Sequence, residues 1–206
     1  MAKISTYTTD TVISASDKLI GTDADSSNAT KNFLVSDISA YISSGIATSL
    51  AVTNVLNATD THDQTPSGLD TPLQVTFGIA QGTGTDPVMV DALGNITFNE
   101  SGIYLFNGYA NFGRGGLSGG VAVVAFRALL NGVQAGVTKV VEIKDADDLV
   151  PYDLTLPINA TAGDVLTWEI MRDSSGVDQG GLYAHTLLGG WGNVPSVSVS
   201  IYKIGL

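Results

Sequence analysis

The sequence predicts an all-β, antiparallel sandwich or barrel over its C-terminal two thirds, behind an extended and helical N-terminal segment. From residue 73 onward, about eight or nine short strand-forming runs follow one another without intervening helices. Charged residues make up only 14% of the chain and glycine contributes 24 of its 206 residues, which suits short strands joined by many turns. That length allows one sizeable core and an appendage.

Residues 1–33 are polar and rich in Ser, Thr and Asp, and their scattered hydrophobic residues are too few to close a core. Such a segment is either a disordered tail or an arm that becomes ordered on a neighbouring molecule. We expect an extended anchoring arm. Its candidate anchor residues are Tyr7, Ile13, Leu19, Ile20 and Phe33.

Residues 34–72 are predicted to form a short helical neck and a linker. Ser36 is the expected N-cap, and Ile38 and Ile42 lie four residues apart on one helix face. The Ser-Ser-Gly sequence at 43–45 is expected to interrupt the helix, which then resumes over 46–56. The stretch that follows contains two prolines and many turn-forming residues, and therefore predicts a linker.

The head domain, predicted over 73–206, begins with alternating apolar residues at 73–77 and a short run at 87–90. Its most informative stretch is residues 95–114, which predicts a strand, a tight turn and a longer strand. Both faces of that longer strand are apolar. Ile103, Leu105 and Tyr109 fall on one face, and Tyr104, Phe106, Ala110 and Phe112 fall on the other.

An antiparallel strand normally buries one face and exposes the other to water. We therefore expect one face of the longer strand to fill the core and the other to meet a second sheet or a second subunit. Phe106 and Trp168 are the expected core aromatics.

The remaining strands are marked by turns and by alternation. Asn131-Gly132 is a strong signal for a two-residue hairpin between the runs 121–130 and 136–144. Further strands are predicted at 152–158 and 164–172. The final run, 196–204, alternates most regularly. Its Val197, Val199 and Ile201 face one way, and its Ser198, Ser200 and Tyr202 face the other.

Four stretches carry a resemblance to a known family: ITFNESGIYLF (96–106), RALLNGV (127–133), TAGDVLTWEI (161–170) and the alternating last strand. In order and spacing they resemble the jelly-roll domain shared by the complement globular heads and the tumour necrosis factor superfamily. The resemblance implies a homotrimer that packs the sheet with the first, third and last strands around a three-fold axis. The implied trimer-interface candidates are Tyr104, Phe106, Tyr109, Phe112, Ser198, Ser200 and Tyr202.

The N-terminal stretch SASDKLIGTDADSSNATKNFLVSDISAYI (14–42) resembles the leaders of tailed-bacteriophage virion appendage proteins. This resemblance implies a structural protein of the virion, such as a head fibre, a decoration protein or a tail fibre, made in the cytoplasm of the bacterial host. The arm would then bind other virion proteins of the capsid or tail.

Composition argues against several other partners. The net charge is −11 and Lys and Arg total only 9, so we expect no nucleic-acid partner. No apolar run approaches the length of a membrane helix, so no membrane insertion is expected. Cysteine is absent, which leaves no disulfide and no thiolate chemistry.

Enzymatic chemistry is not predicted either. The letters GLSGG (116–120) match the G-x-S-x-G pattern, but a nucleophile elbow needs a strand, the serine and a helix in that order. Asp145, Asp147 and Asp148 could hold Ca²⁺, yet they lack EF-hand spacing and a solvated acidic loop is the simpler interpretation. We therefore expect a non-enzymatic protein without a cofactor.

The alternative function is a receptor- or glycan-binding module that uses the loops 113–120 and 176–193. Trp191 lies between glycines in the second loop and is the candidate ligand-contact residue. The sequence leaves open whether this side chain is exposed as a binding platform or buried under its own loop.

Overall fold

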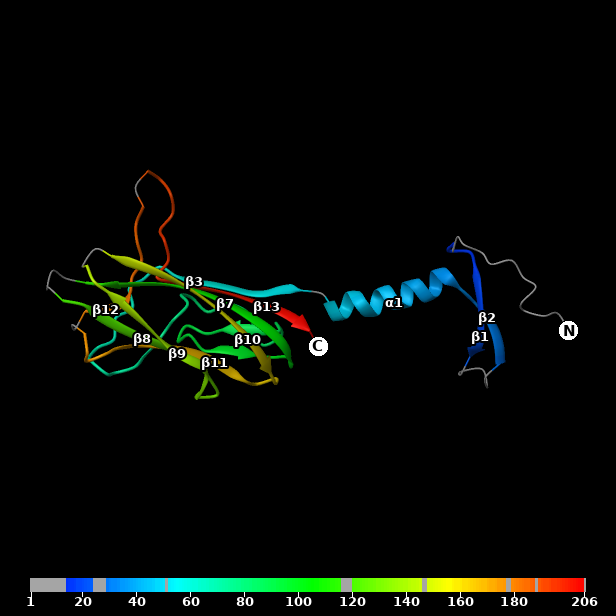
Figure 1. Cartoon of the computed structure of the whole chain (residues 1–206), viewed down its shortest axis with the longest axis horizontal. Coiled ribbons are helices and arrows are strands. Elements are labelled where there is room, and N and C mark those ends of the chain that lie inside the picture. Colours follow the sequence, from blue (N-terminus) through cyan, green and yellow to red (C-terminus); the bar gives the residue numbers. More distant parts are fainter. Residues whose placement is uncertain are drawn as a thin grey trace. The chain divides into compact units, whose positions relative to one another are not determined.

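The computed structural model describes residues 14–23, 29–50, 52–115, 120–145, 148–176, 179–187 and 189–205 (Figure 1). The chain divides into two compact units, Met1–Leu50 and Ala51–Leu206.

The N-terminal unit contains a β-hairpin followed by a helix. Strand β1 (Lys18–Asp23) pairs antiparallel with β2 (Ala29–Leu34), and helix α1 (Val35–Leu50) begins directly after β2. The backbone carbonyls of residues 15 and 17 accept hydrogen bonds from the first N–H groups of the helix, which satisfies donors that have no partner within it. Part of the predicted arm thus forms a hairpin of its own.

Helix α1 differs from the sequence prediction in two respects. It begins one residue before the expected cap, Ser36, and it runs through 43–45 without interruption. The predicted resumption over 46–56 is wrong in its second half, because strand β3 (Thr53–Asp60) starts there. Strand β3 belongs to the head, so the head begins ahead of residue 73 and the predicted linker is partly a strand.

The head is a sandwich of two antiparallel sheets. The first sheet, five-stranded over the described residues, has the order β10-β7-β13-β3, with β12 paired to β7. The second, six-stranded over the same residues, has the order β5-β6-β11-β8-β9, with β4 paired to β11. The strands are β4 (Leu73–Gln74), β5 (Val88–Val90), β6 (Ile96–Phe98), β7 (Gly102–Arg114), β8 (Ala122–Leu130), β9 (Val133–Ile143), β10 (Leu149–Ala160), β11 (Val165–Arg172), β12 (Gly180–Leu182) and β13 (Val197–Gly205).

The chain passes repeatedly from one sheet to the other, as a jelly roll requires. Strand β3 lies in the first sheet, β4 to β6 in the second, β7 in the first, β8 and β9 in the second, and β10 in the first again. Strand β11 then returns to the second sheet before β12 and β13 complete the first. The predicted fold class, an all-β antiparallel jelly-roll sandwich, is confirmed.

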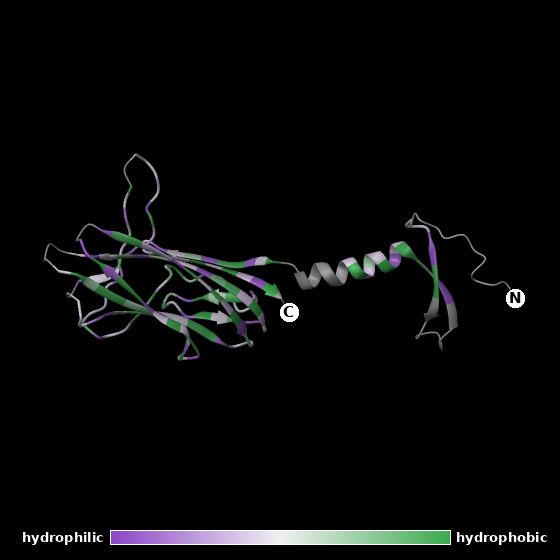
Figure 2. Cartoon of the chain, in the orientation of Figure 1, coloured by the Kyte–Doolittle hydropathy of each residue, from purple (hydrophilic) through white to green (hydrophobic). Residues whose placement is uncertain are grey.

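The core lies between the two sheets and is aromatic at its centre. The strands of the head are marked by hydrophobic residues along their length (Figure 2). The Phe106 ring of β7 lies 4.9 Å from the Trp168 ring of β11, and the Phe112 ring lies 5.2 Å from the Phe126 ring of β8. All four side chains are buried, which confirms the predicted core positions of Phe106 and Trp168.

Candidate self-association surface

The candidate functional surface is the outer face of the first sheet, which we call the outer sheet face. Strand register aligns its side chains in three rows that cross β10, β7, β13 and β3 in that order. The rows are Asp153–Tyr109–Ser198–Thr59, Thr155–Asn107–Ser200–Asn57 and Pro157–Leu105–Tyr202–Asn54.

The middle row is a hydrogen-bonded polar ladder. The Thr155 hydroxyl donates to the side-chain oxygen Oδ1 of Asn107 over 3.0 Å, and the Ser200 hydroxyl donates to Oδ1 of Asn57 over 2.7 Å. The side-chain amides of Asn54 and Asn57 bond each other in both directions, at 2.9 and 3.0 Å. Because these polar groups have partners within the chain, covering them with another molecule costs little.

The last row is the most apolar one. Leu105 and Tyr202 are half-buried there, and Ile103, the next outward residue of β7, is 42% exposed. This end of the sheet is also where β3 begins, since Thr53 pairs with Lys203. The outer sheet face therefore offers uncharged and partly apolar surface at the end where the chain enters the head.

The first row contains the one ionisable pair of the three rows, Tyr109 opposite Asp153. Burial raises the pKa of the Tyr109 phenol, and the negative charge of Asp153 raises it further. The phenol therefore stays neutral at physiological pH.

The predicted interface residues fall into two sets. Tyr109, Ser198, Ser200 and Tyr202 lie on the outer sheet face, in the register above. The prediction was wrong for Tyr104, Phe106 and Phe112. These side chains alternate with Leu105 and Tyr109 along β7 and fill the core of the single chain.

The predicted interface set lacked the residues of β3 and β10 in these rows, and also two residues of β7. Leu105 and Asn107 lie on the same side of β7 as Tyr109, and the period of two that placed Tyr109 there also places them. The hydrogen-bonded ladder through Asn107 depends on pairing between strands distant in sequence, which one sequence does not reveal.

A second surface lies at one open edge of the sandwich, where β9 ends the second sheet and β10 ends the first. A groove of about 410 Å³ separates the two strands, and we call it the edge groove. Its lining also contains the charged residues Arg127, Lys139 and Asp153, and its apolar lining residues are Phe126, Ala128, Ala135, Val137, Tyr152, Leu154 and Leu156. Val137 is 67% exposed, so the groove presents apolar surface to its surroundings.

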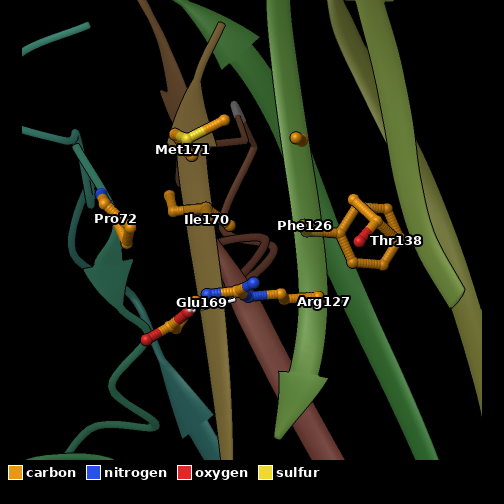
Figure 3. Close-up of a pocket in the computed structure, with 8 residues that line it drawn as sticks. Pro72, Phe126, Arg127, Thr138, Glu169, Ile170 and Met171 are labelled. Atoms are coloured by element: carbon orange, nitrogen blue, oxygen red, sulfur yellow. Dashed lines mark hydrogen bonds and ion pairs between the residues drawn. The ribbon is translucent and has the colours of Figure 1, made fainter. Parts of the chain in front are cut away.

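A smaller pocket of about 210 Å³ lies on the second sheet (Figure 3). Arg127 of β8 and Glu169 of β11 point toward each other across it, and one Glu169 oxygen accepts from Nε at 3.0 Å and from Nη2 at 2.8 Å. The remaining lining is mostly apolar, including Pro72, Ile170 and Met171. Because the two charges neutralise each other, the pocket offers a cross-strand ion pair rather than a reactive group.

The loop between β12 and β13 projects away from the sandwich and is drawn in orange in Figure 1. Its base is held by two backbone hydrogen bonds between His185 and Val194, at 3.0 and 2.7 Å. Trp191, near its tip, is 77% exposed. Of the two alternatives that the sequence left open for this side chain, the structure shows the exposed one.

The structure describes some of the remaining predicted site residues and not others. Leu19 and Ile20 of β1 are exposed, and Phe33 of β2 is half-buried. Tyr7 and Ile13 lie outside the described residues, as do 116–119 of the G-x-S-x-G match and Asp147 of the acidic loop.

Two further findings apply to the described ranges. Within them, no three His, Cys, Asp or Glu side chains are grouped so as to hold a metal ion. No helix among the same residues is long and apolar enough to cross a membrane.

No protein-family profile matches the chain, and no curated protein matches it. Among solved structures, the globular domain of a zebrafish complement 1qA protein is similar at 10% identity and a TM-score of 0.43, covering 72% of this chain and 94% of that one. Murine APRIL is similar at 13% identity and a TM-score of 0.42, covering 74% of this chain and 99% of that one. Likeness at this level carries no argument about function, and the fold stands on the strand pairing described above.

Proposed function

We propose that this chain is a non-enzymatic structural protein of a bacteriophage virion, an appendage whose jelly-roll heads form a homotrimer and whose N-terminal unit anchors it. The observation that supports self-association is the presence of two different surfaces on one head that expose apolar side chains, Ile103 on the outer sheet face and Val137 in the edge groove. Within the described residues of the head, no other element covers the outer sheet face or the edge groove, and the two surfaces share Asp153 and Thr155 of β10.

Two different surfaces favour a closed ring. When one copy places its outer sheet face against the edge groove of the next, the contact is heterologous and repeats until the ring closes. A two-fold dimer formed through the outer sheet face alone would leave Val137 and the edge groove uncovered. The sequence resemblance of residues 73–206 to a trimeric jelly-roll family supports three as the number of copies.

The test measures the mass of the fragment 51–206, which holds the entire sandwich core. Light scattering should give three times the monomer mass for the unchanged fragment. Leu105→Glu on the outer sheet face and Val137→Glu in the edge groove should each give a monomer. Leu93→Glu is the matched control, because Leu93 is an exposed leucine in the turn between β5 and β6, away from both surfaces.

Mixing the two variants tests the heterologous contact itself. The edge groove of the Leu105→Glu chain and the outer sheet face of the Val137→Glu chain are both intact, so an equimolar mixture should form a one-to-one dimer and stop there. A monomeric unchanged fragment at micromolar concentration would refute self-association. A mixture that stays monomeric while the unchanged fragment is oligomeric would refute the ring.

The N-terminal unit supports the anchoring part of the proposal. A two-stranded hairpin is only marginally stable in water, and β1–β2 leaves Leu19 and Ile20, which point to opposite faces, both exposed. The leader-like sequence at 14–42 supports a virion as the partner. Immunogold labelling of purified particles with an antibody against the head tests this, and unlabelled particles would exclude a virion appendage.

A second candidate function, recognition of a receptor or glycan, is favoured by Trp191 at the tip of the projecting loop. An exposed indole ring can stack on the apolar face of a sugar. Trp191→Ala should then abolish binding of the purified head to a glycan array without changing its mass. If the array shows no binding by the unchanged head, this candidate is rejected.

A further inference from the structure

We propose that the α1 helices of three copies pack in parallel against one another and form a three-helix neck. The contact is an apolar stripe on α1 that includes Ile38 and Ile42, which we call the α1 stripe. In the sequence the four-residue spacing continues at Ile46 and Leu50. This inference rests on the homotrimer proposed above and assigns a second contact within it.

Among the described residues of the N-terminal unit, the turn at 14–17 meets α1 on the side opposite the α1 stripe. The turn at 14–17 lies against a groove of small side chains that includes Ser36 and Ala40, and its carbonyl oxygens accept hydrogen bonds from the N–H groups of Val35 and Ser36. On the α1 stripe Ile42 is 50% exposed, and beside the stripe Tyr41 is 81% exposed. At about 100° per residue, Ala40 points roughly 200° away from Ile38, on the opposite face of the helix, and it is itself exposed.

The helix needs a partner for its stability. It has only 16 residues, including one glycine and several serine and β-branched residues, which are weak helix formers. Isolated helices of about 12–15 residues are marginal in water even when rich in alanine, so a helix of this composition depends on packing of its apolar face. The α1 stripe is the face that is available for such packing.

Identical helices suit this face better than a charged partner does. Asp37 is the single charged residue of α1, and the helix contains no Lys or Arg. The α1 stripe therefore has no charge pattern that would select an oppositely charged protein, and three copies can meet there without repulsion.

The position of α1 in the chain brings its copies together. Helix α1 ends at Leu50 and β3 begins at Thr53, so two residues connect the helix to the head. Two extended residues span at most about 7 Å, so the end of each helix is tethered to the first strand of its own head by a short connection. A ring of heads therefore holds three α1 helices at an effective concentration on the order of millimolar or above, which makes a weak helix contact sufficient.

The experiment uses the absence of cysteine from the chain, so that any introduced cysteine is unique. Ile42→Cys and its control Ala40→Cys are made in the full-length protein and oxidised under mild conditions. Ile42→Cys should form disulfide-linked pairs of chains, because cysteines that meet on one helix seam lie close enough to bridge. Ala40→Cys is also exposed but lies on the opposite face of the helix, so it should remain a thiol. The native mass of both variants should remain that of three chains.

A third variant measures the packing without a cross-link. Ile42→Asp should lose the helical circular-dichroism signal at 222 nm, while the heads keep the protein trimeric. The control Ser43→Asp, at the neighbouring exposed position off the α1 stripe, should retain more of that signal.

The outcomes separate the two proposals. A trimeric native mass without an Ile42→Cys cross-link, or with equal cross-linking at positions 40 and 42, overturns the three-helix neck and leaves the trimeric heads in place. A monomeric native mass of the unchanged chain overturns the homotrimer and the neck together.

Discussion

At the scale of single residues, a glycine makes room for the largest side chain of the core. Trp168 contacts the rings of Phe106, Phe77 and Phe126, with centroid distances of 4.9, 6.0 and 6.3 Å. It lies directly over Gly108 of β7. A Cβ atom at position 108 would come within 2.6 Å of the Phe106 ring and closer still to the indole of Trp168.

We therefore expect Gly108→Ala to lower the free energy of unfolding by about 1–3 kcal/mol through overpacking. Trp168→Ala should lower it by about 3–5 kcal/mol, because it leaves a large cavity. Trp191→Ala is the control and should change it by less than about 0.5 kcal/mol, since that side chain is exposed. Urea denaturation monitored by circular dichroism measures all three, and an unchanged midpoint for Gly108→Ala would contradict this packing.

A second residue, Asp60 at the end of β3, is a buried hydrogen-bond acceptor that stabilises one end of the sandwich. Its buried carboxylate accepts hydrogen bonds from the backbone N–H of His62 at 2.9 Å, the Thr76 hydroxyl at 2.8 Å and the Gly78 N–H at 3.3 Å. Burial alone would raise the pKa of this carboxyl. The hydrogen bonds from His62 and Thr76 outweigh burial and hold the pKa below its usual value.

This shift predicts a pH dependence of stability. Because the pKa is lower in the folded than in the unfolded chain, the stabilisation by Asp60 is complete above the unfolded value near 3.9 and is lost as the pH falls through the folded value. Asp60→Asn should lower the free energy of unfolding at pH 7 by about 1–3 kcal/mol, the range expected when a buried hydrogen-bonding group loses its partner. It should also reduce the fall in that free energy between pH 5 and pH 3, because the carboxyl group that takes up a proton there is gone. Glu142→Gln, on the exposed face of β9, is the control. Parallel pH profiles for Asp60→Asn and the unchanged protein would refute this assignment.

At the scale of elements, the β8–β9 hairpin shows how a local turn is tied to a distant strand. Asn131 and Gly132 both have positive φ angles, +51° and +76°, as a two-residue turn of this kind requires. The Asn131 side chain also accepts a hydrogen bond from the Val165 N–H at 2.9 Å and donates one to the Asp164 carboxylate at 2.8 Å. The turn thereby fixes the start of β11.

Replacing Asn131 tests this double role. Asn131→Ala should cost about 1–3 kcal/mol, because it loses a residue suited to positive φ and leaves the Val165 N–H without its acceptor. Asn131→Gly keeps the backbone freedom but removes the side chain, so the difference between the two variants isolates the backbone contribution. Hydrogen exchange at Val165 should accelerate in both, and protection equal to that of the unchanged chain would contradict the bond to β11.

The elements also show what one sequence can and cannot predict. Asn131-Gly132 and the alternation along β13 are local signals, and both were predicted correctly. Strand β3 was missed because TNVLNATD has few bulky apolar residues, and its inward Leu56 and Ala58 acquire meaning only beside β13. The candidate surface was likewise predictable only in part. The period of two in β7 was visible, but which of its two apolar faces is the core depends on the second sheet.

At the scale of the whole molecule, the division at residue 50 predicts that the head is thermodynamically independent of the N-terminal unit. The hydrophobic core cluster draws all its residues from position 56 onward. Removal of residues 1–34 takes away both strands of the hairpin but no member of that cluster. We expect the truncated chain to keep the thermal midpoint and the native mass of the full chain.

The same truncation should abolish attachment to the virion. Ordering a chain segment costs on the order of 1–2 kcal/mol per residue, so an anchoring segment must gain extensive contact with its partner. The exposed Leu19 and Ile20 of β1 offer such contact, and three N-terminal units on one trimer multiply weak contacts through their effective concentration. Occupancy on purified particles, measured by quantitative mass spectrometry, should fall to background for the truncated chain.

Leu19→Asp with Ile20→Asp in the full chain should reduce this occupancy as well, whereas Lys18→Ala, on the same strand, should not. If truncated heads still decorate particles at normal occupancy, the head is the anchor and the N-terminal unit points away from the virion.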